Sequence, residues 1–203
     1  MVKLAVIVGS TRPVRRTAVA AQWVLDVARA HPSVLDGTAT VDLLDLADFD
    51  LPLLDEPLPP LFGDYRNAHT RRWAEAVGAH DGFVFVTPEY NHAMPAALKN
   101  AIDYLFAEWN DKAAGFVSHG VQGGTRAVEQ LRQVLAEVKV AGVRSSVALS
   151  AFTDFVIDDP ALPGTIAPCE HQTGTLHEML DELVAWSAAL RPLRTRPTER
   201  VGA

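Results

Sequence analysis

The chain has 203 residues, 48% of them hydrophobic, and a formal net charge of −7 at pH 7. This length and composition favour one domain with a substantial core, and the acidic balance argues against nucleic acid or an anionic membrane surface as a partner. The single cysteine, Cys169, excludes an internal disulfide and a cysteine-rich zinc site. We find neither a leader-like segment nor an apolar run of about 18 residues, and we expect a cytoplasmic protein.

Short apolar runs alternate along the chain with helical patterns. Four runs have the composition of buried strands, and a fifth alternates like an edge strand. In chain order they are 3–9, 39–46 (the alternating run), 82–88, 113–120 and 144–150. Apolar residues recur at helical spacing in 17–30, 67–79, 95–106, 124–141 and 173–190. Pro95 suits the first turn of the third of these helices.

This alternation predicts a parallel sheet with helices on both faces. Five strands in a chain of this length match the flavodoxin-like α/β fold with strand order 2-1-3-4-5. We expect one domain over 1–191 and a loose Pro- and Arg-rich tail over 192–203. The stretches 47–66 and 151–170 lack a regular pattern, and loops of this length are often functional or face a partner.

In such sheets, ligands bind beyond the carboxyl ends of the strands. The loop after the first strand reads "GSTRPVRRTA" (9–18), with neither G-x-G-x-x-G nor G-K-[ST]. It combines hydroxyls and arginines with a helix N-terminus, which predicts a site for a terminal monophosphate. The candidate residues are Ser10, Thr11, Arg12, Arg16 and Thr17. The alternative is a plain helix cap at Thr17 with solvated arginines.

The loop after the third strand begins the segment "TPEYNHAMPAALKNAID" (87–103). Prolines 88 and 95 restrict the backbone on both sides of this loop. Exposed amides beside an aromatic ring suit a flat heterocycle, and the candidates are Pro88, Glu89, Tyr90 and Asn91. The alternative is a strand-to-helix turn in which Tyr90 only packs.

The loop after the fourth strand reads "SHGVQGGTRA" (118–127). Its glycines let a backbone approach a ligand closely, although a flexible turn before a helix explains them equally well. The candidates here are Ser118, Gly120, Gly123 and Gly124. His92 and His119 are more typical of structural hydrogen bonding than of catalysis, and we find no metal-binding spacing.

Together, these three loops resemble the NAD(P)H-dependent FMN reductase family, whose members have the flavodoxin-like fold and include flavin, quinone, azo-dye and chromate reductases. The resemblance covers roughly residues 3–150. Its most diagnostic part is P-E-Y-N followed by a proline and L-K-N-A-I-D.

The resemblance implies a role for each candidate residue. Ser10, Arg12 and Thr17 would bind the FMN phosphate, with Thr11 and Arg16 as further contacts. Pro88, Glu89, Tyr90 and Asn91 would form a platform for the flavin ring, and Ser118, Gly120, Gly123 and Gly124 would border its other edge. Many members carry an asparagine where this chain has Val19, so one phosphate contact is expected to be missing, with Arg16 as its substitute. No catalytic side chain and no metal ligand are implied.

The implied activity is two-electron transfer from NADPH or NADH through FMN to a small acceptor such as a flavin, a quinone or an azo compound. A homodimer or homotetramer with the flavin near the subunit interface is also implied. The apolar faces of 95–106 and 124–141 suit such an interface. Trp109, in "AEWND", is expected to be exposed beside it or else to pack within its own chain.

Two other functions are compatible with the sequence. A flavodoxin-like electron carrier would bind FMN but react poorly with NADPH or NADH. A non-redox scaffold domain would keep the fold without the flavin, because fold alone does not determine activity.

Overall fold

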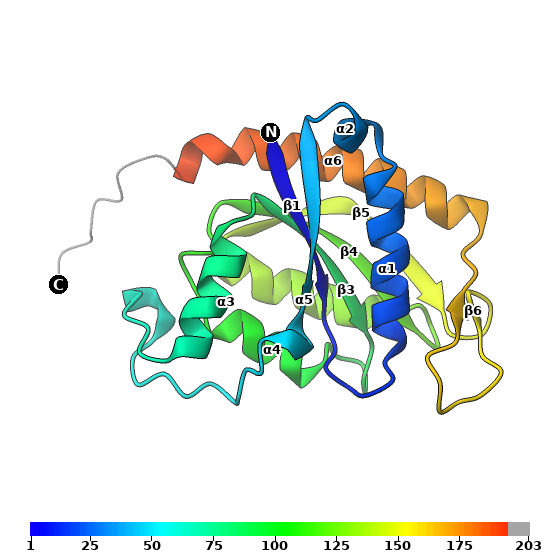
Figure 1. Cartoon of the computed structure of the whole chain (residues 1–203), viewed down its shortest axis with the longest axis horizontal. Helices are drawn as coiled ribbons and strands as arrows, with labels where there is room; N and C mark the ends of the chain where they lie inside the picture. The colour runs from blue at the N-terminus through cyan, green and yellow to red at the C-terminus, as the bar shows by residue number, and fades with distance from the viewer. Residues whose placement is uncertain (195–203) are drawn as a thin grey trace.

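A five-stranded parallel sheet forms the centre of the molecule in a computed structural model, which describes residues 1–194 (Figure 1). The strand order is β2-β1-β3-β4-β5, and all four neighbouring pairs are parallel. This confirms the predicted flavodoxin-like order, with β2 at an edge. The strands are β1 (Val2–Val8), β2 (Ala39–Asp45), β3 (Gly82–Pro88), β4 (Lys112–Gly120) and β5 (Val140–Ser150).

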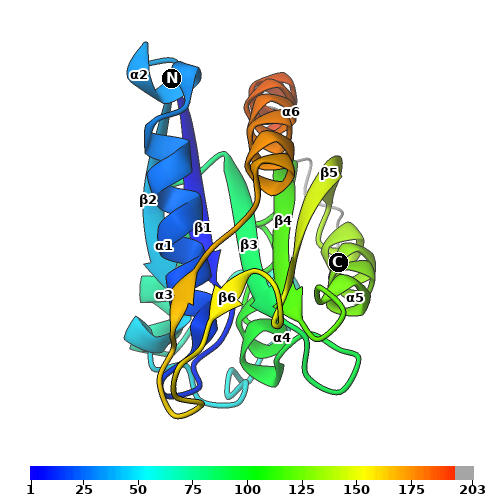
Figure 2. The same ribbon diagram turned by 90° about the vertical axis from the view of Figure 1, so that its right-hand side faces the viewer.

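Helices cover both faces of the sheet (Figure 2). On one face lie α1 (Arg16–Arg29) and α6 (Glu170–Arg194), and on the other lie α3 (Ala68–Gly78), α4 (Ala96–Asp103) and α5 (Thr125–Glu137). Side chains of β1 alternate between the two layers: Val6 packs under α1 and α6, whereas Ile7 packs under the other helices. Because both layers are apolar, the central strands are continuous hydrophobic runs.

Short elements occupy the connections. They are the helix α2 (Pro32–Leu35), the 3₁₀ turns Leu46–Asp48 and Pro60–Phe62, and the antiparallel pair β6 (Phe155–Val156) and β7 (Thr165–Ile166). The last pair lies within the stretch 151–170, where the sequence shows no strand pattern. Within residues 1–194, no helix has both the length and the hydropathy needed to cross a membrane.

Several predicted boundaries differ from the structure. The helix predicted over 124–141 ends at Glu137, because Lys139 turns the chain with a φ of 57° and β5 begins at Val140. Pro95 precedes the first turn of α4 as its N-cap residue. Helix α6 continues to Arg194, three residues beyond the predicted domain end, and the remaining predicted tail, 195–203, lies outside the described residues.

Trp109 is buried, so the expected exposure is wrong and packing within its own chain is correct. Its indole Nε1 donates to the Ile102 carbonyl at 3.2 Å. The ring packs edge-on against Phe83, with 5.0 Å between ring centroids, and against Trp73 at 5.9 Å. The polar neighbours that suggested exposure, Glu108, Asn110 and Asp111, are themselves half-buried.

Candidate cofactor site

Three loops meet at the carboxyl edge of the sheet, after β1, β3 and β4 (Figure 2). Ser10 Oγ of the first loop lies 3.0 Å from Tyr90 Oη of the second. Thr17 Oγ1 lies 2.9 Å from His119 Nε2 of the third, and the His119 carbonyl accepts from the Glu89 amide at 3.0 Å. The structure therefore brings together all three sequence-predicted loops and connects them by hydrogen bonds.

The first loop leaves β1 through a close backbone contact. The Gly9 amide donates to the Val86 carbonyl at 2.8 Å, and a Cβ at position 9 would lie 2.9 Å from that oxygen. Ser10 is buried, and its hydroxyl accepts from the Arg12 amide at 3.4 Å. Thr11 and Arg12 are exposed. The loop thus has a buried hydroxyl at its base and a hydroxyl and a guanidinium at its surface.

The start of α1 has the properties of an anion site. Arg15 is the N-cap residue and makes no capping hydrogen bond, and the first turn carries no acidic residue. The Nε of Arg16 is buried without a hydrogen-bond partner among residues 1–194. A buried donor without a partner is costly, and the positive end of the helix dipole favours negative charge. These features fit a phosphate group.

Two residues of this loop have other partners. The Arg15 guanidinium forms an ion pair with Asp45 at the end of β2. Thr17, in the first turn of α1, directs its hydroxyl to His119 and is not the helix cap. The alternative of a cap at Thr17 is therefore wrong.

The loop after β3 contains a tight turn. The Tyr90 amide donates to the Ala93 carbonyl at 2.9 Å, and the Ala93 amide donates back at 3.0 Å. Asn91 and His92 between them have φ values of 52° and 67°, which is the pattern of a type I′ turn. The Glu89 and Tyr90 amides are occupied, so among the amides of residues 89–91 only that of Asn91 is without a partner in the described structure. Tyr90 keeps 38% of its surface exposed.

Glu89 points toward α5, away from solvent. Its carboxylate accepts from the Arg126 amide at 3.1 Å and from Arg126 Nε at 2.8 Å, with Nη2 at 2.7 Å. Burial acts to raise the pKa of Glu89, but the hydrogen bonds and charge of Arg126 outweigh it, so the pKa lies below its usual value. The side chain therefore holds the loop to the start of α5.

Hydrogen bonds between residues of the loop after β4 hold its conformation. The Ser118 hydroxyl donates to the Gly123 carbonyl at 2.7 Å, and the Gly120 carbonyl accepts from the Gly123 amide at 3.1 Å. Gly124 has a φ of 74° and would place a Cβ 2.8 Å from the His119 carbonyl oxygen. Only glycine fits this position without a shift of the backbone.

His119 is absent from the predicted ligand contacts. It is 8% exposed and packs against Phe155 at 5.6 Å between ring centroids. Burial first, and then the charges of Arg16 and Arg12, lower its pKa to about 4, so the ring is uncharged at neutral pH. The sequence signals only a histidine next to a glycine-rich loop, and its contact with Thr17 depends on the tertiary fold.

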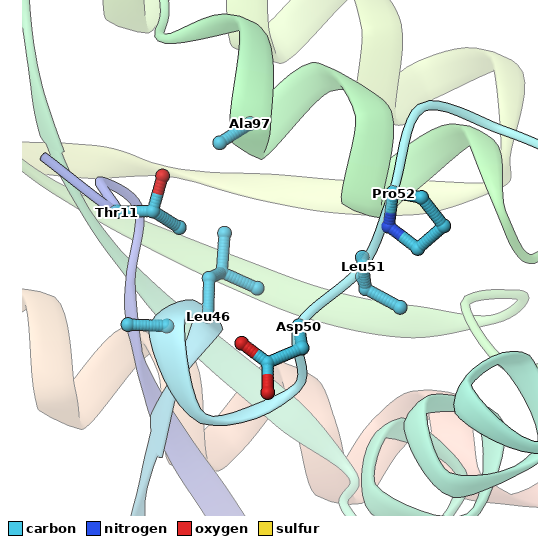
Figure 3. Close-up of a pocket in the computed structure, with 7 residues that line it drawn as sticks. Thr11, Leu46, Asp50, Leu51, Pro52 and Ala97 are labelled. Atoms are coloured by element: carbon cyan, nitrogen blue, oxygen red, sulfur yellow. The ribbon is translucent and has the colours of Figure 1, made fainter.

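A cavity of about 410 Å³ opens beside the first loop (Figure 3). Its lining comes from three segments and combines one hydroxyl and one carboxylate with apolar groups: Thr11, Leu46, Ala47, Asp50, Leu51, Pro52 and Ala97. Sequence reasoning did not name the residues after β2. The only signal was the irregular stretch 47–66, because loops of that length are often functional.

The strand order and the parallel pairing define a flavodoxin-like α/β protein. A family model described as NADPH-dependent FMN reductase matches residues 2–154. The chain belongs to this family. The predicted NAD(P)H- and FMN-dependent oxidoreductase is thereby confirmed, in preference to the electron carrier and the scaffold domain.

Individual relatives agree with this membership. The NAD(P)H-dependent FMN reductase ntnL of a Nectria species is 37% identical over 161 residues, which are 76% of this chain and 79% of that protein. A quinone reductase of Escherichia coli K12 is 37% identical over 115 residues, 54% of this chain and 60% of that one. Among solved structures, the flavoenzyme NAD(P)H:(acceptor) oxidoreductase FerB of Paracoccus denitrificans shares the fold, with a TM-score of 0.68 at 24% identity over 93% of this chain and 98% of that chain.

Proposed function

We propose that the phosphate group of FMN binds at the first turn of α1. The observation that carries this proposal is the buried Nε of Arg16, which has no hydrogen-bond partner within residues 1–194, beside a helix N-terminus without a side-chain cap. Ser10, Thr11, Arg12 and Thr17 supply further donors from the same loop. Charge-assisted hydrogen bonds to phosphate are stronger than bonds between neutral groups, which favours FMN over a flavin without a phosphate.

The flavin ring has its candidate platform in the other two loops. Pro88, Tyr90 and Asn91 offer a rigid turn, an exposed aromatic surface and one available amide. Gly120, Gly123 and Gly124 allow close approach of the backbone. The polar atoms of Glu89 and Ser118 are bonded to Arg126 and Gly123, so these two side chains hold the loops in place and are not available to the ligand.

Bound FMN would supply two-electron redox chemistry between NADPH or NADH and a small acceptor such as a flavin, a quinone or an azo compound. The role of the protein is to bind and orient these molecules. Glu89 is held by Arg126, and the His119 ring is buried and uncharged. We therefore assign no catalytic acid or base within the described residues.

We also propose that the protein is a cytoplasmic homodimer or homotetramer. Large apolar side chains are exposed in the segment between β2 and α3, with 81% of Leu53, 66% of Leu61 and 68% of Phe62 accessible. The segment is held to α4 by Asn100, which accepts from the Leu54 amide at 2.9 Å. Exposed apolar groups of this kind often mark interfaces. Light scattering after size exclusion gives the mass, and a monomer at micromolar concentration contradicts this part of the proposal.

Equilibrium binding of FMN and of riboflavin tests the site. The flavin-free protein is titrated with each, and quenching of flavin fluorescence reports binding. Two or more charge-assisted hydrogen bonds predict that FMN binds at least about 100-fold more tightly than riboflavin. Equal affinity for both flavins contradicts a phosphate site, and failure to bind either contradicts the proposed function.

A further inference from the structure

A buried histidine lies directly behind the proposed phosphate site. His119 is near the end of β4, yet its Nε2 reaches the hydroxyl of Thr17 in the first turn of α1 at 2.9 Å. Both residues are buried, at 8% and 1% exposure, and Phe155 of β6 packs against the imidazole. The position of the ring is therefore fixed by the core and does not depend on solvent.

The tautomer of His119 decides what the Thr17 hydroxyl can do. A neutral imidazole carries one N–H, on either Nε2 or Nδ1. If Nε2 carries the proton, it donates to Thr17 Oγ1, and the hydroxyl proton of Thr17 is available to another acceptor. If Nδ1 carries it, Thr17 must donate to Nε2, and its hydroxyl proton is no longer available.

An anion at the start of α1 favours the first arrangement. A phosphate oxygen without a proton accepts hydrogen bonds and does not donate them. The Thr17 hydroxyl can donate to such an oxygen only when it accepts from His119. A chain of two hydrogen bonds aligned in one direction is also stronger than two separate bonds.

We propose that His119 is a positioning residue that donates from Nε2 to Thr17 and thereby directs the Thr17 hydroxyl to the flavin phosphate. This inference rests on the proposed function. It assigns to His119 an effect on the phosphate end of the ligand alone. The affinity for riboflavin, which lacks the phosphate, is expected to be independent of His119.

Two substitutions separate this role from simple packing. His119→Phe keeps a ring against Phe155 but removes the donor, and His119→Gln keeps an N–H donor on a side chain of similar reach. We expect His119→Phe to weaken FMN binding on the order of 10-fold, the worth of one hydrogen bond to a charged group, with riboflavin affinity within twofold of wild type. His119→Gln restores most of the FMN affinity. In a Thr17→Val background, His119→Phe has no further effect, because the two residues act through one bond.

Nitrogen-15 NMR of the wild-type protein tests the same point without substitution. With FMN bound, the His119 signals should show a proton on Nε2, and a proton on Nδ1 would overturn the proposal. Equal losses of FMN and riboflavin affinity in His119→Phe would also overturn it, since they indicate packing alone. If wild type prefers FMN and His119→Phe keeps that preference, only this inference fails. If wild type shows no preference for FMN, the proposed function itself fails.

Discussion

The three arginines of the first loop have three different environments. Among residues 1–194, the Nε atoms of Arg15 and Arg16 are both buried without a hydrogen-bond partner, but only Arg15 is paired with a carboxylate, that of Asp45. Arg12 is exposed at the loop surface. An arginine that already has a carboxylate partner gains little from a second anion. The charge available to a ligand phosphate therefore comes from Arg12 and Arg16.

Replacing Arg12 by alanine tests whether Arg12 supplies charge to the ligand phosphate. We expect Arg12→Ala to weaken FMN binding by about 1.5–3 kcal/mol, the usual worth of a hydrogen bond to a charged group. Arg29→Ala is the matched control, because Arg29 is exposed at the other end of α1. Calorimetric or fluorescence titration of the flavin-free variants gives both affinities. An Arg12→Ala variant that binds FMN like the Arg29→Ala variant would remove Arg12 from the site.

Among the structural elements, the loop before α5 has a strict backbone requirement at Gly124. Gly124 combines a positive φ with contacts that leave no room for a Cβ, 2.8 Å from the His119 oxygen and 2.9 Å from the His119 nitrogen. Gly37 has a similar φ of 78°, but a Cβ there would meet nothing within 4 Å. Alanine substitutions at Gly37 and Gly124 therefore separate the cost of a left-handed backbone conformation from the cost of a close contact made by the added Cβ.

We expect Gly37→Ala to lower the free energy of unfolding by about 1 kcal/mol, for the left-handed conformation alone. Gly124→Ala should lower it by at least about 2 kcal/mol, because the backbone of His119 must also move. Urea unfolding monitored by circular dichroism gives both values. Equal losses in the two variants would show that the close contact at Gly124 costs nothing.

The Glu89–Arg126 contact connects a site loop to the start of α5. We expect Glu89→Gln to destabilise the fold by about 1–2 kcal/mol near pH 7, since the carboxylate accepts several hydrogen bonds. The folded-state pKa of Glu89 lies below its usual value, so its contribution is present above pH ~5 and is lost as the pH falls toward that lower pKa.

Urea unfolding of both proteins between pH 3.5 and 7 measures this contribution. The stability gap between wild type and Glu89→Gln should be constant above pH ~5 and narrow below pH ~4.5. Glu129→Gln is the control for replacing a carboxylate by an amide, because Glu129 is exposed on α5, the helix that carries Arg126. A gap that stays constant down to pH 3.5 would contradict the role given to the carboxylate.

The strands and the three site loops could be predicted because both depend on local sequence, and the strand order followed from matching five parallel strands to a known fold. Buried parallel strands are short apolar runs, and glycine, proline and arginine mark the loops between them. The end of α5 could not be predicted, since its valines suit a helix as well as β5 and only the turn at Lys139 separates them. The burial of Trp109 and the Thr17–His119 contact depend on residues distant in sequence, so no periodicity reveals them.

In the molecule as a whole, the proposed cofactor site and the ion-pair network that anchors α6 lie at opposite ends of the sheet. At the amino end of β3, Asp81 accepts from the Lys3 amide at 2.8 Å and pairs with Arg191 at 2.5 Å and with Arg194. Burial acts to raise the pKa of Asp81, but these partners outweigh it and hold the pKa below its usual value. Asp81 thus ties α6 to β1 and β3 at the end of the sheet opposite the site.

Substitution of Asp81 should therefore affect stability and leave ligand binding unchanged. We expect Asp81→Asn to lower the free energy of unfolding by about 2–3 kcal/mol. Asp103→Asn, which breaks the exposed pair with Lys99, should cost less than about 1 kcal/mol. Urea unfolding gives the stabilities, and titration gives the FMN affinity. A loss of FMN affinity in the folded Asp81→Asn variant would contradict this expectation and show that the two ends of the sheet are coupled.

The reaction of FMN-loaded protein with a nicotinamide donor is the most direct measurement of function. The loaded protein, freed of excess flavin, is mixed anaerobically with NADPH and, in a separate run, with NADH, and the visible absorbance of the flavin is followed. We expect rapid bleaching with at least one donor, and restoration of the colour when a quinone is added. Flavin that stays bound and oxidised with both donors would contradict the assignment of this protein as a reductase.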